Sequence, residues 1–332
     1  MSIKSELLQL LEKDKGKCLS GELIGRKLHC SRTAVWKAVH ALREEGYQIE
    51  AGTNRGYRLL ECNNILSAEG IRVYLKEKES RVWVEERVLS TNLSLKQLAV
   101  SGGLPHGSVY AVNTQTAGKG RRGRQFFSPP GSGLYFSVLL YPRQSMGNNF
   151  SLTAAAASAV YLAIRDVCGV ETDIKWVNDL YYNGKKICGI LTEAVTDIES
   201  GSIEFAVVGI GINLYTPENG FPPEFAGKAG ALLERGTRID RNRLVAETVN
   251  YLLQEAAKER ISPVYLRKNM VPGHTILVQT KQGEELWEAM KIEDDGRLLV
   301  KDAAGEYRKA AFGEIAFRMT EEEAYGNDYK TI

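Results

Sequence analysis

The sequence has few of the residues that form disulfides or hold transition metals. Its five cysteines are odd in number and widely spaced, with no CxxC pair, and its four histidines show no metal-ligand spacing. This pattern argues against a disulfide framework and a zinc site. We expect buried thiols and no metal held by the protein alone.

A membrane-spanning run and a secretion signal are also missing. The longest apolar run, residues 153–164, is rich in alanine and is about half of the roughly 20 residues needed to cross a bilayer, so we expect a buried helix. The first residues, MSIKSE, contain no apolar signal core and no small-residue cleavage site. We therefore expect a cytoplasmic protein without a membrane partner.

Acidic residues are absent from residues 87–165, although the chain-wide frequency of 41 in 332 predicts about ten there. Inside this stretch lies GKGRRGR, residues 118–124, which combines three glycines with four cations. Glycine lets backbone N–H groups turn toward an anion, and the cations add charge-assisted hydrogen bonds. The loop therefore predicts a site for phosphates or a carboxylate, with a solvated basic loop as the alternative.

Two common nucleotide motifs do not explain this loop. It formally matches GxGxxG, but FFSPP, residues 126–130, follows it where a dinucleotide fold needs a helix, and no acid lies about 20 residues on. No glycine-lysine-serine or glycine-lysine-threonine stands at P-loop spacing either. An adenylate-forming site remains.

The chain divides into a basic head and a nearly neutral body. Residues 1–60 hold eleven Lys and Arg against seven Asp and Glu, a charge of +4, which leaves −2 for residues 61–332. At 332 residues the chain also exceeds one hydrophobic core. A basic head predicts a polyanionic partner for that part.

The head has the pattern of a winged helix-turn-helix. Apolar residues at helical spacing and serines at positions 20 and 31 predict three helices, and residues 47–50 and 57–60 predict a hairpin wing. Val35, Val39 and Leu42 form the buried stripe of the third helix. Its other face and the wing tip carry the candidate DNA-binding residues, with a merely solvated face as the alternative. These residues are Ser31, Arg32, Thr33, Trp36, Lys37, His40 and Arg55.

A second polar cluster follows in the body. Residues 173–180 predict one strand, and the Asn183-Gly184 turn joins it to a strand over residues 185–193. This hairpin places Lys186 beside Lys175, Asn178 and Asp179, where the lysine can hold a carboxylate or phosphate and the aspartate can accept a proton or hold Mg²⁺. An ordinary Lys175–Asp179 ion pair is the alternative. Residues 207–214 predict a buried strand that brings Asn213 to a ribose or phosphate.

Two sets of motifs resemble known families. In the head, CSRTAVWK (30–37), LREEGY (42–47) and GYRL (56–59) resemble the DNA-binding heads of biotin operon repressors. In the body, STN (90–92), Gln115, GKGRRGR, KWVNDL (175–180), KICG (186–189) and GIGIN (209–213) together resemble the catalytic domain of biotin protein ligases. The body resemblance covers roughly residues 84–215.

The resemblance implies an α+β fold in three domains. These are a winged helix-turn-helix at residues 1–60, a class II synthetase-like mixed-sheet catalytic domain at 68–268, and a small SH3-like β-barrel at 269–332. Residues 61–67 form the linker between the first two. Short β patterns broken at Gly283, Gly296 and Gly305 independently predict a small barrel there.

The resemblance also implies the reaction and its partners. Biotin attacks the α-phosphate of ATP, supplied with Mg²⁺, and the biotinyl-adenylate then acylates a lysine of a biotin carboxyl carrier protein, such as the carrier domain of acetyl-CoA carboxylase or pyruvate carboxylase. The head implies a two-fold symmetric operator, bound by a homodimer when biotinyl-AMP is loaded. We hypothesise that the adenylate orders the basic loop and that the loop completes the dimer surface.

The matched motifs assign a role to individual residues. The catalytic group is Lys186, Arg121 and Asp179. The biotin and biotinyl-AMP site comprises Ser90, Thr91, Asn92, Gln115, Gly118, Lys119, Gly120, Arg121, Lys186 and Gly189. The ATP and adenylate site comprises Arg122, Arg124, Phe126, Lys175, Asn178 and Asn213, with Phe126 stacking on adenine.

The sequence departs from the family pattern at Lys119, where arginine is usual, and at Val177, where proline is usual. The lysine keeps the charge and loses bidentate geometry, and the valine makes the bend before Asn178 less rigid. Two rival functions stay open: a lipoate-type acyl ligase, and a biotin sensor that represses without catalysis.

Overall fold

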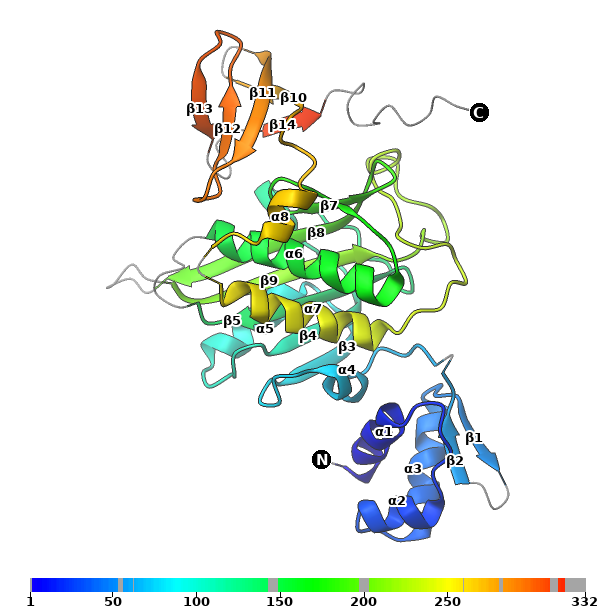
Figure 1. The fold of residues 1–332 in the computed structure, drawn as a ribbon. Helices are drawn as coiled ribbons and strands as arrows, with labels where there is room; N and C mark the ends of the chain where they lie inside the picture. The colour runs from blue at the N-terminus through cyan, green and yellow to red at the C-terminus, as the bar shows by residue number, and fades with distance from the viewer. Residues whose placement is uncertain are drawn as a thin grey trace.

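The computed structural model describes residues 2–52, 56–61, 63–142, 149–196, 203–258, 260–280, 283–310 and 316–319. Figure 1 shows three parts in chain order: a helical head at the N-terminus, a central sheet covered by helices, and a small sheet at the C-terminal end. The central sheet and its helices carry most of the buried apolar side chains.

The head consists of α1 (Ile3–Lys13), α2 (Gly21–Lys27), α3 (Arg32–Glu44) and a hairpin of β1 (Ile49–Gly52) and β2 (Gly56–Leu59). The hydroxyls of Ser20 and Ser31 accept hydrogen bonds from the backbone N–H groups of Leu23 and Ala34, so each serine caps a helix as predicted. The predicted stripe of α3 is buried in the core of the head. The three helices and the hairpin are confirmed, with β1 beginning two residues later than predicted.

The central sheet has seven strands in the order β3-β4-β5-β9-β8-β7-β6. Their bounds are β3 Val82–Val88, β4 Val109–Gln115, β5 Gly133–Leu140, β6 Asp173–Lys175, β7 Asp179–Tyr182, β8 Lys185–Thr196 and β9 Ile203–Asn213. The β3–β4 pair is parallel and the other neighbours are antiparallel, which makes this a mixed sheet.

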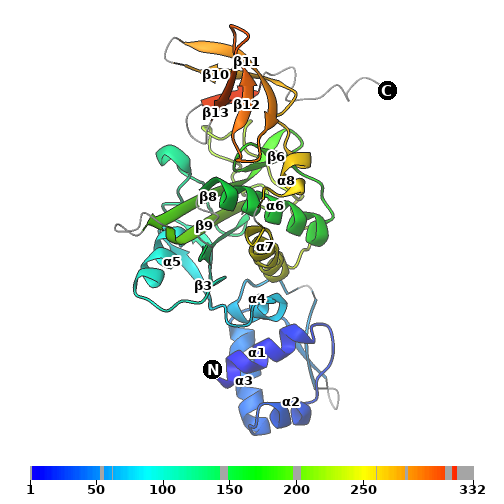
Figure 2. The same ribbon diagram turned by 60° about the vertical axis from the view of Figure 1, so that its left-hand side comes forward.

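Helices cover both faces of this sheet. On one face, α6 (Asn149–Cys168) packs beside α7 (Arg241–Ala256), and α5 (Thr91–Val100) packs on the other face, as Figure 2 shows from the side. The alanines of α6 are buried against the sheet, so the predicted buried helix is confirmed. This helix is long and apolar enough to cross a membrane, but most of residues 150–168 are buried inside the protein.

One predicted strand is wrong. Residues 173–180 do not form a continuous strand, because β6 ends at Lys175 and the chain reverses through residues 176–178 before β7 begins at Asp179. The two strands then pair with each other, with Lys175 opposite Asp179. The turn is held from outside the β6–β7 ladder, since Tyr265 Oη donates to the Val177 carbonyl at 3.0 Å. A partner 88 residues away has no local signature.

The C-terminal part is a five-stranded antiparallel sheet in the order β13-β12-β11-β10-β14. Its strands are β10 Thr275–Gln279, β11 Glu284–Ile292, β12 Leu298–Lys301, β13 Tyr307–Ala310 and β14 Ala316–Met319, and α8 (Pro263–Lys268) precedes them. The predicted breaks at Gly283, Gly296 and Gly305 lie between these strands.

The three parts are joined by specific contacts. In the head, α1 packs on α4 (Ala68–Tyr74), and Lys15 lies 3.8 Å from Asp240 at the start of α7. At the other end, Trp176 Nε1 donates to the Gly296 carbonyl at 3.1 Å in a buried contact. The C-terminal sheet therefore touches the turn that precedes Asp179.

Candidate active site

A cavity of about 550 Å³ lies where β4, β7, β8 and β9 approach the basic loop. Its wall includes the cationic side chains of Lys119, Arg121, Arg122, Arg124, Lys175, Lys186 and Lys228. Asp179 is the one acidic residue among the described lining residues. A cavity lined by charges of one sign concentrates ligands of the opposite sign, so this site suits an anion.

The basic loop folds back on itself at the mouth of the cavity. The Gly120 N–H donates to the Arg124 carbonyl at 2.7 Å, and the Phe126 N–H donates to the Gly118 carbonyl at 2.9 Å. Arg122, between them, has a φ of 55°. The loop is thereby held as a short hairpin that presents several cations in one place.

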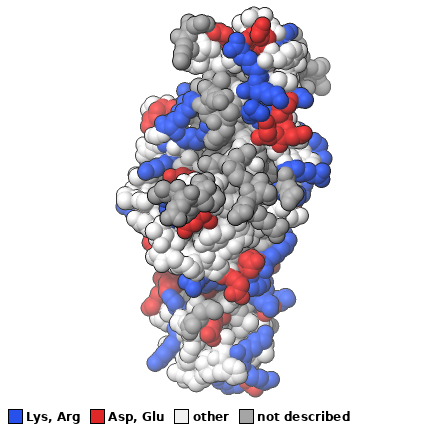
Figure 3. Space-filling view, turned by 90° about the vertical axis from the view of Figure 1, so that its left-hand side faces the viewer, with Lys and Arg blue, Asp and Glu red and all other residues white. Residues whose placement is uncertain are grey.

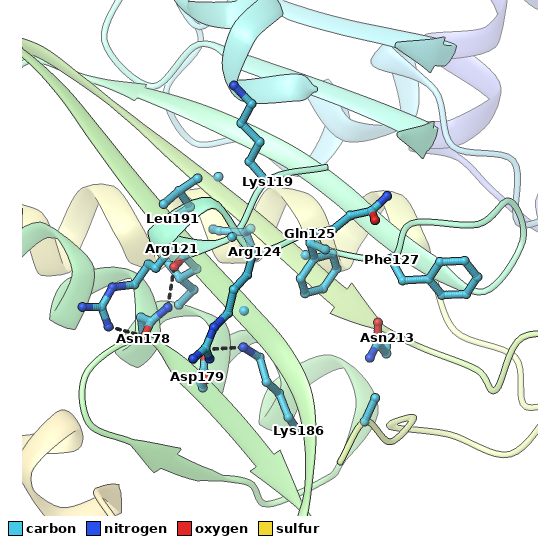
Figure 4. Close-up of a pocket in the computed structure, with 18 of the residues that line it drawn as sticks. Lys119, Arg121, Arg124, Gln125, Phe127, Asn178, Asp179, Lys186, Leu191 and Asn213 are labelled. Carbon is cyan, nitrogen blue, oxygen red and sulfur yellow. Dashed lines mark hydrogen bonds and ion pairs between the residues drawn. The ribbon is translucent and has the colours of Figure 1, made fainter. Parts of the chain in front are cut away.

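Two side-chain pairs cross the cavity wall, as Figure 4 shows. Lys186 Nζ lies 2.7 Å from Asp179 Oδ1. Arg121 donates from its guanidinium to Asn178 Oδ1 at 3.2 Å, and the Asn178 amide donates to the Ile190 carbonyl at 2.8 Å. The two pairs tie the loop and β8 to the residues around the start of β7.

Lys186 and Asp179 form an ion pair in this site. Lys175, which a simple strand pairing would match with Asp179, has its Nζ 5.6 Å above the Tyr181 ring centroid. Burial lowers the pKa of Lys175 and also lowers the pKa of the Arg121 guanidinium, because a buried cation loses hydration. Burial raises the pKa of Tyr181 to about 12, so its hydroxyl stays neutral.

A polar wall lies at the N-terminus of α5. The Thr91 N–H donates to Gln115 Oε1 at 2.9 Å, and Gln115 Nε2 donates to Ser128 Oγ at 3.0 Å. Thr91 Oγ1 lies 2.7 Å from the buried Ser137 Oγ. Hydroxyl and amide groups held this way can recognise a neutral polar ring by hydrogen bonds.

A pair of glycines forms the floor beneath Phe126. Gly189 on β8 and Gly211 on β9 are paired across the sheet. A Cβ atom on Gly211 would lie 2.4 Å from the Phe126 ring, and one on Gly189 would lie 3.1 Å from it. The ring can occupy this place only because Gly211 lacks a side chain, and a side chain at Gly189 would also crowd it.

If Phe126 stacks on the adenine of ATP, as the family resemblance implies, we expect Gly211→Ala to displace the Phe126 ring and to raise the KM for ATP by about tenfold, since base–aromatic stacking contributes about 1–3 kcal/mol. Steady-state kinetics with varied ATP measure this. Phe126→Ala is the matched comparison, because the double variant should be no worse than Phe126→Ala alone if the glycine acts through the ring. Additive losses would contradict this account.

The structure brings most of the predicted site residues together. Gly118 is the predicted residue that does not line the cavity, because it is buried behind the loop with Phe126 O only 2.6 Å from its would-be Cβ. The predicted residues in the wall are Ser90, Thr91, Asn92, Gln115, Lys119, Gly120, Arg121, Arg122, Arg124, Phe126, Lys175, Asn178, Asp179, Lys186, Gly189 and Asn213.

Several wall residues were not predicted. Gly209 and Tyr181 lie within or beside the motifs that the sequence singled out, so their positions carried a signal that was not used. Phe221, Phe225 and Lys228 come from a loop without any motif. This loop supports the site, because the Lys186 N–H donates to the Lys228 carbonyl at 2.9 Å.

The head presents a separate polar face. The predicted DNA-binding residues of α3 and its cap are all exposed, and Trp36 is 57% exposed, with the tilted His40 ring beside it at 5.5 Å between ring centroids. Arg32 lies 3.1 Å from Glu22 on α2. Arg55 lies outside the described residues. Figure 3 shows Lys and Arg on both flanks of the head at the lower end of the molecule.

Comparison with known proteins gives consistent matches. A model of the biotin/lipoate A/B protein ligase family matches residues 84–213, and a model of an HTH domain matches residues 4–58. The bifunctional ligase/repressor BirA of Bacillus subtilis is 33% identical over 318 residues, which cover 92% of this chain and 95% of the relative. The protein of the same name from Escherichia coli is 29% identical, with 96% and 98% covered.

A solved structure of similar fold is the biotin protein ligase from Aquifex aeolicus in complex with biotin and ATP. It aligns with a TM-score of 0.59 and 24% sequence identity, and it covers 72% of this chain and 99% of that chain. At this identity the likeness concerns the fold of the chain.

Proposed function

This chain belongs to the family of bifunctional biotin protein ligases and repressors, and on that premise we propose that it performs both activities. As a ligase it forms biotinyl-5′-AMP from biotin and ATP and transfers the biotinyl group to a carrier lysine. As a repressor it controls genes of biotin synthesis or transport in response to biotin.

One observation carries the ligase half of this proposal. Four separate segments, namely the start of α5, the basic loop, the β6–β7 turn and β8, meet at one cavity that joins a polar wall to a cluster of cations. Biotin has the matching composition, with a polar ring at one end and a carboxylate at the other. ATP supplies further anionic groups for the cationic part.

The proposed first step is attack of the biotin carboxylate oxygen on the α-phosphorus of ATP, with pyrophosphate leaving. Lys186 stabilises the negative charge that develops on the carboxylate and the α-phosphate, and Arg121 contacts the same groups from the loop. Both cations are already held by Asp179 and Asn178, so little rearrangement is needed as charge develops. Lys119, Gly120, Arg122 and Arg124 bind the remaining phosphate oxygens.

In the proposed second step the carrier lysine amine attacks the acyl carbon of the adenylate, and AMP leaves. Asp179 accepts the proton of the incoming amine or orients it. Ser90, Thr91, Asn92 and Gln115 hold the biotin ring, and Gly189, which lines the same cavity, contacts the biotinyl-AMP. Phe126 stacks on adenine, while Lys175 and Asn213 contact the ribose or phosphate.

Magnesium fits this site as a companion of ATP. The described residues contain no group of three or more His, Cys, Asp or Glu that could hold a metal ion, and Asp179 supplies a single carboxylate in the cavity. Mg²⁺ is commonly held by one or two carboxylates together with substrate phosphates, where it neutralises phosphate charge.

The ligase is tested by incubating the purified chain with biotin, MgATP and a biotin carrier domain. We expect the mass of the carrier to increase by one biotinyl group. A lipoate-type ligase would label its carrier with lipoate instead, and a sensor would bind biotin without labelling any carrier. Either result would overturn the proposed activity.

The other partners follow from the same family. We propose a carrier domain of acetyl-CoA carboxylase or pyruvate carboxylase as acceptor, operator DNA as the partner of α3, and a homodimer when biotinyl-AMP is bound. In the dimer the adenylate orders the basic loop, which completes the contact surface. We further propose a cytoplasmic location and an SH3-like character for the C-terminal sheet.

We expect Arg32→Ala to weaken operator binding by about 1–3 kcal/mol and to relax the sequence preference, if this exposed side chain at the start of α3 reaches a base edge. The change is measured by titrating the biotin- and ATP-loaded protein against a duplex selected from a random library. Lys4→Ala is the matched control, because it removes one cation of the head on α1, beside Glu45. Equal losses in both variants would indicate a general charge effect.

A further inference from the structure

Glu193 on β8 lies behind the cavity wall and does not line the cavity. Its Oε2 accepts a hydrogen bond from Asn92 Nδ2 at 2.7 Å. Asn92 is 5% exposed, at the start of α5, within the segment that forms the polar wall. A carboxylate that does not line the cavity is therefore hydrogen-bonded to a residue of the polar wall, which the proposed function assigns to biotin.

The orientation of the Asn92 amide follows from its neighbours. Asn92 Nδ2 faces two acceptors, the Glu193 carboxylate and the Leu191 carbonyl at 3.3 Å. An ionised carboxylate and a backbone carbonyl accept hydrogen bonds and cannot donate them, so the NH₂ group must face them. The oxygen Oδ1 must then face the other way, toward Ser137 Oγ, which lies 2.6 Å from it.

Packing holds the amide in the same place. A Cβ atom on Gly209 would lie 2.2 Å from Asn92 Oδ1, so this glycine on β9 leaves the space that the amide fills. Ser137 is fully buried on β5. The amide is thus fixed both by its hydrogen bonds and by the strands around it.

The orientation of Asn92 decides where the next protons point. Ser137 Oγ lies close to both Asn92 Oδ1 and Thr91 Oγ1, at 2.6 and 2.7 Å, but a hydroxyl has one proton to donate. Because Asn92 Oδ1 can only accept, the Ser137 proton goes to it. The Thr91 hydroxyl has two neighbours that could take its proton, Gln115 Oε1 at 3.2 Å and Ser137 Oγ at 2.7 Å. With the Ser137 proton on Asn92, only the Thr91 proton can bridge the shorter contact, so we take Thr91 to donate to Ser137.

Thr91 consequently faces the cavity as an acceptor. Its proton is used inside the wall, so its oxygen can accept a hydrogen bond from an N–H group of a ligand. Beside it, Gln115 Oε1 accepts a hydrogen bond from the Thr91 N–H, and Gln115 Nε2 donates one of its two hydrogens to Ser128 Oγ. The second hydrogen of Nε2 can then be donated to a ligand carbonyl. A cyclic urea matches this order of acceptor and donor, whereas a dithiolane ring has neither group.

We propose that Glu193 is a positioning residue that sets the hydrogen-bond polarity of the wall through Asn92, Ser137 and Thr91, and thereby selects a ring with an N–H donor beside a carbonyl. This inference rests on the proposed function, because it concerns how the same cavity recognises biotin. It assigns no contact between Glu193 and the substrate.

The test measures binding to the full chain by calorimetry, with biotin and ATP titrated separately. We expect Glu193→Ala to raise the Kd for biotin by about tenfold, as loss of a hydrogen bond to a charged group commonly does, and to leave the Kd for ATP unchanged. Glu193→Gln keeps an acceptor oxygen and should raise the Kd by only about twofold to threefold. Glu204→Ala, which removes an exposed acid on β9, is the matched control and should bind biotin like the wild type.

A double-variant cycle tests the route of the effect. If Glu193 acts on the wall through the hydrogen bond of Ser137, then Glu193→Ala should weaken biotin binding little in a protein that already carries Ser137→Ala. The proposal is overturned by unchanged biotin binding in Glu193→Ala, by equal losses in the Gln and Ala variants, or by parallel losses for biotin and ATP with a lower Tm. Wild-type protein that binds biotin without labelling a carrier would refute the ligase and still leave this comparison valid.

Discussion

Replacing Lys186 with alanine is expected to slow formation of biotinyl-5′-AMP by about 10²–10³-fold, the loss usual when one preorganised donor to a developing negative charge is removed. Lys186 meets the requirement for such a donor because its backbone is fixed between β7 and the Lys228 segment, and its amine is held 2.7 Å from Asp179 Oδ1. The variant should keep its fold, since the side chain is 34% exposed.

The adenylation rate is measured as biotin-dependent exchange of pyrophosphate into ATP, which needs no carrier protein. Lys185→Ala is the matched control, because Lys185 is the preceding residue of β8, is exposed and does not line the cavity. We expect the control to react at nearly the wild-type rate. Similar rates for both variants would remove Lys186 from the chemical step.

Replacing Gly296 with alanine is expected to destabilise the protein by about 2–5 kcal/mol, from the sum of a left-handed backbone and an overpacked contact. Gly296 has a φ of 87°, and a Cβ atom there would lie 2.0 Å from the Phe150 ring on α6. The Gly296 carbonyl also accepts the hydrogen bond from Trp176. Ligase activity should fall too, because Trp176 begins the turn that leads to Asn178 and Asp179.

The matched control for this prediction is Gly305→Ala in the same sheet. Gly305 has a similar φ of 85°, but the nearest atom to its would-be Cβ is Lys301 Cε at 3.9 Å. Gly305→Ala should therefore lower the free energy of unfolding only through backbone strain, by about 1–2 kcal/mol. Thermal unfolding measures both variants, and equal shifts in Tm would show that the contact with Phe150 contributes nothing.

The head and the basic loop were predictable because their signals are local. A helix with apolar residues at positions 35, 39 and 42 has one buried face whatever it packs against, so the exposed face of α3 followed directly. The loop of residues 118–124 likewise carries its glycines and cations in one segment. Such patterns depend on spacing along the chain alone.

The missed features depend on contacts between distant residues. The break in the predicted strand at residues 176–178 depends on Tyr265 and Gly296, and the space for Phe126 depends on glycines in two different strands. Glu193 was overlooked because it acts on Asn92, 101 residues away, without entering the cavity. Spacing within a motif shows which residues are close in sequence. It cannot show which distant residues contact the motif and fix its conformation.

The separation of the two binding surfaces has a thermodynamic consequence. No described residue of the head lines the cavity, and α3 lies at the far end of the molecule from the C-terminal sheet (Figure 1). If DNA binds α3 as we propose, it contacts residues that do not line the cavity of the same chain, so the two ligands can be bound together. Any coupling between them is then a linkage free energy, which is reciprocal. If bound adenylate raises the affinity for DNA by a given factor, bound DNA raises the affinity for the adenylate by the same factor.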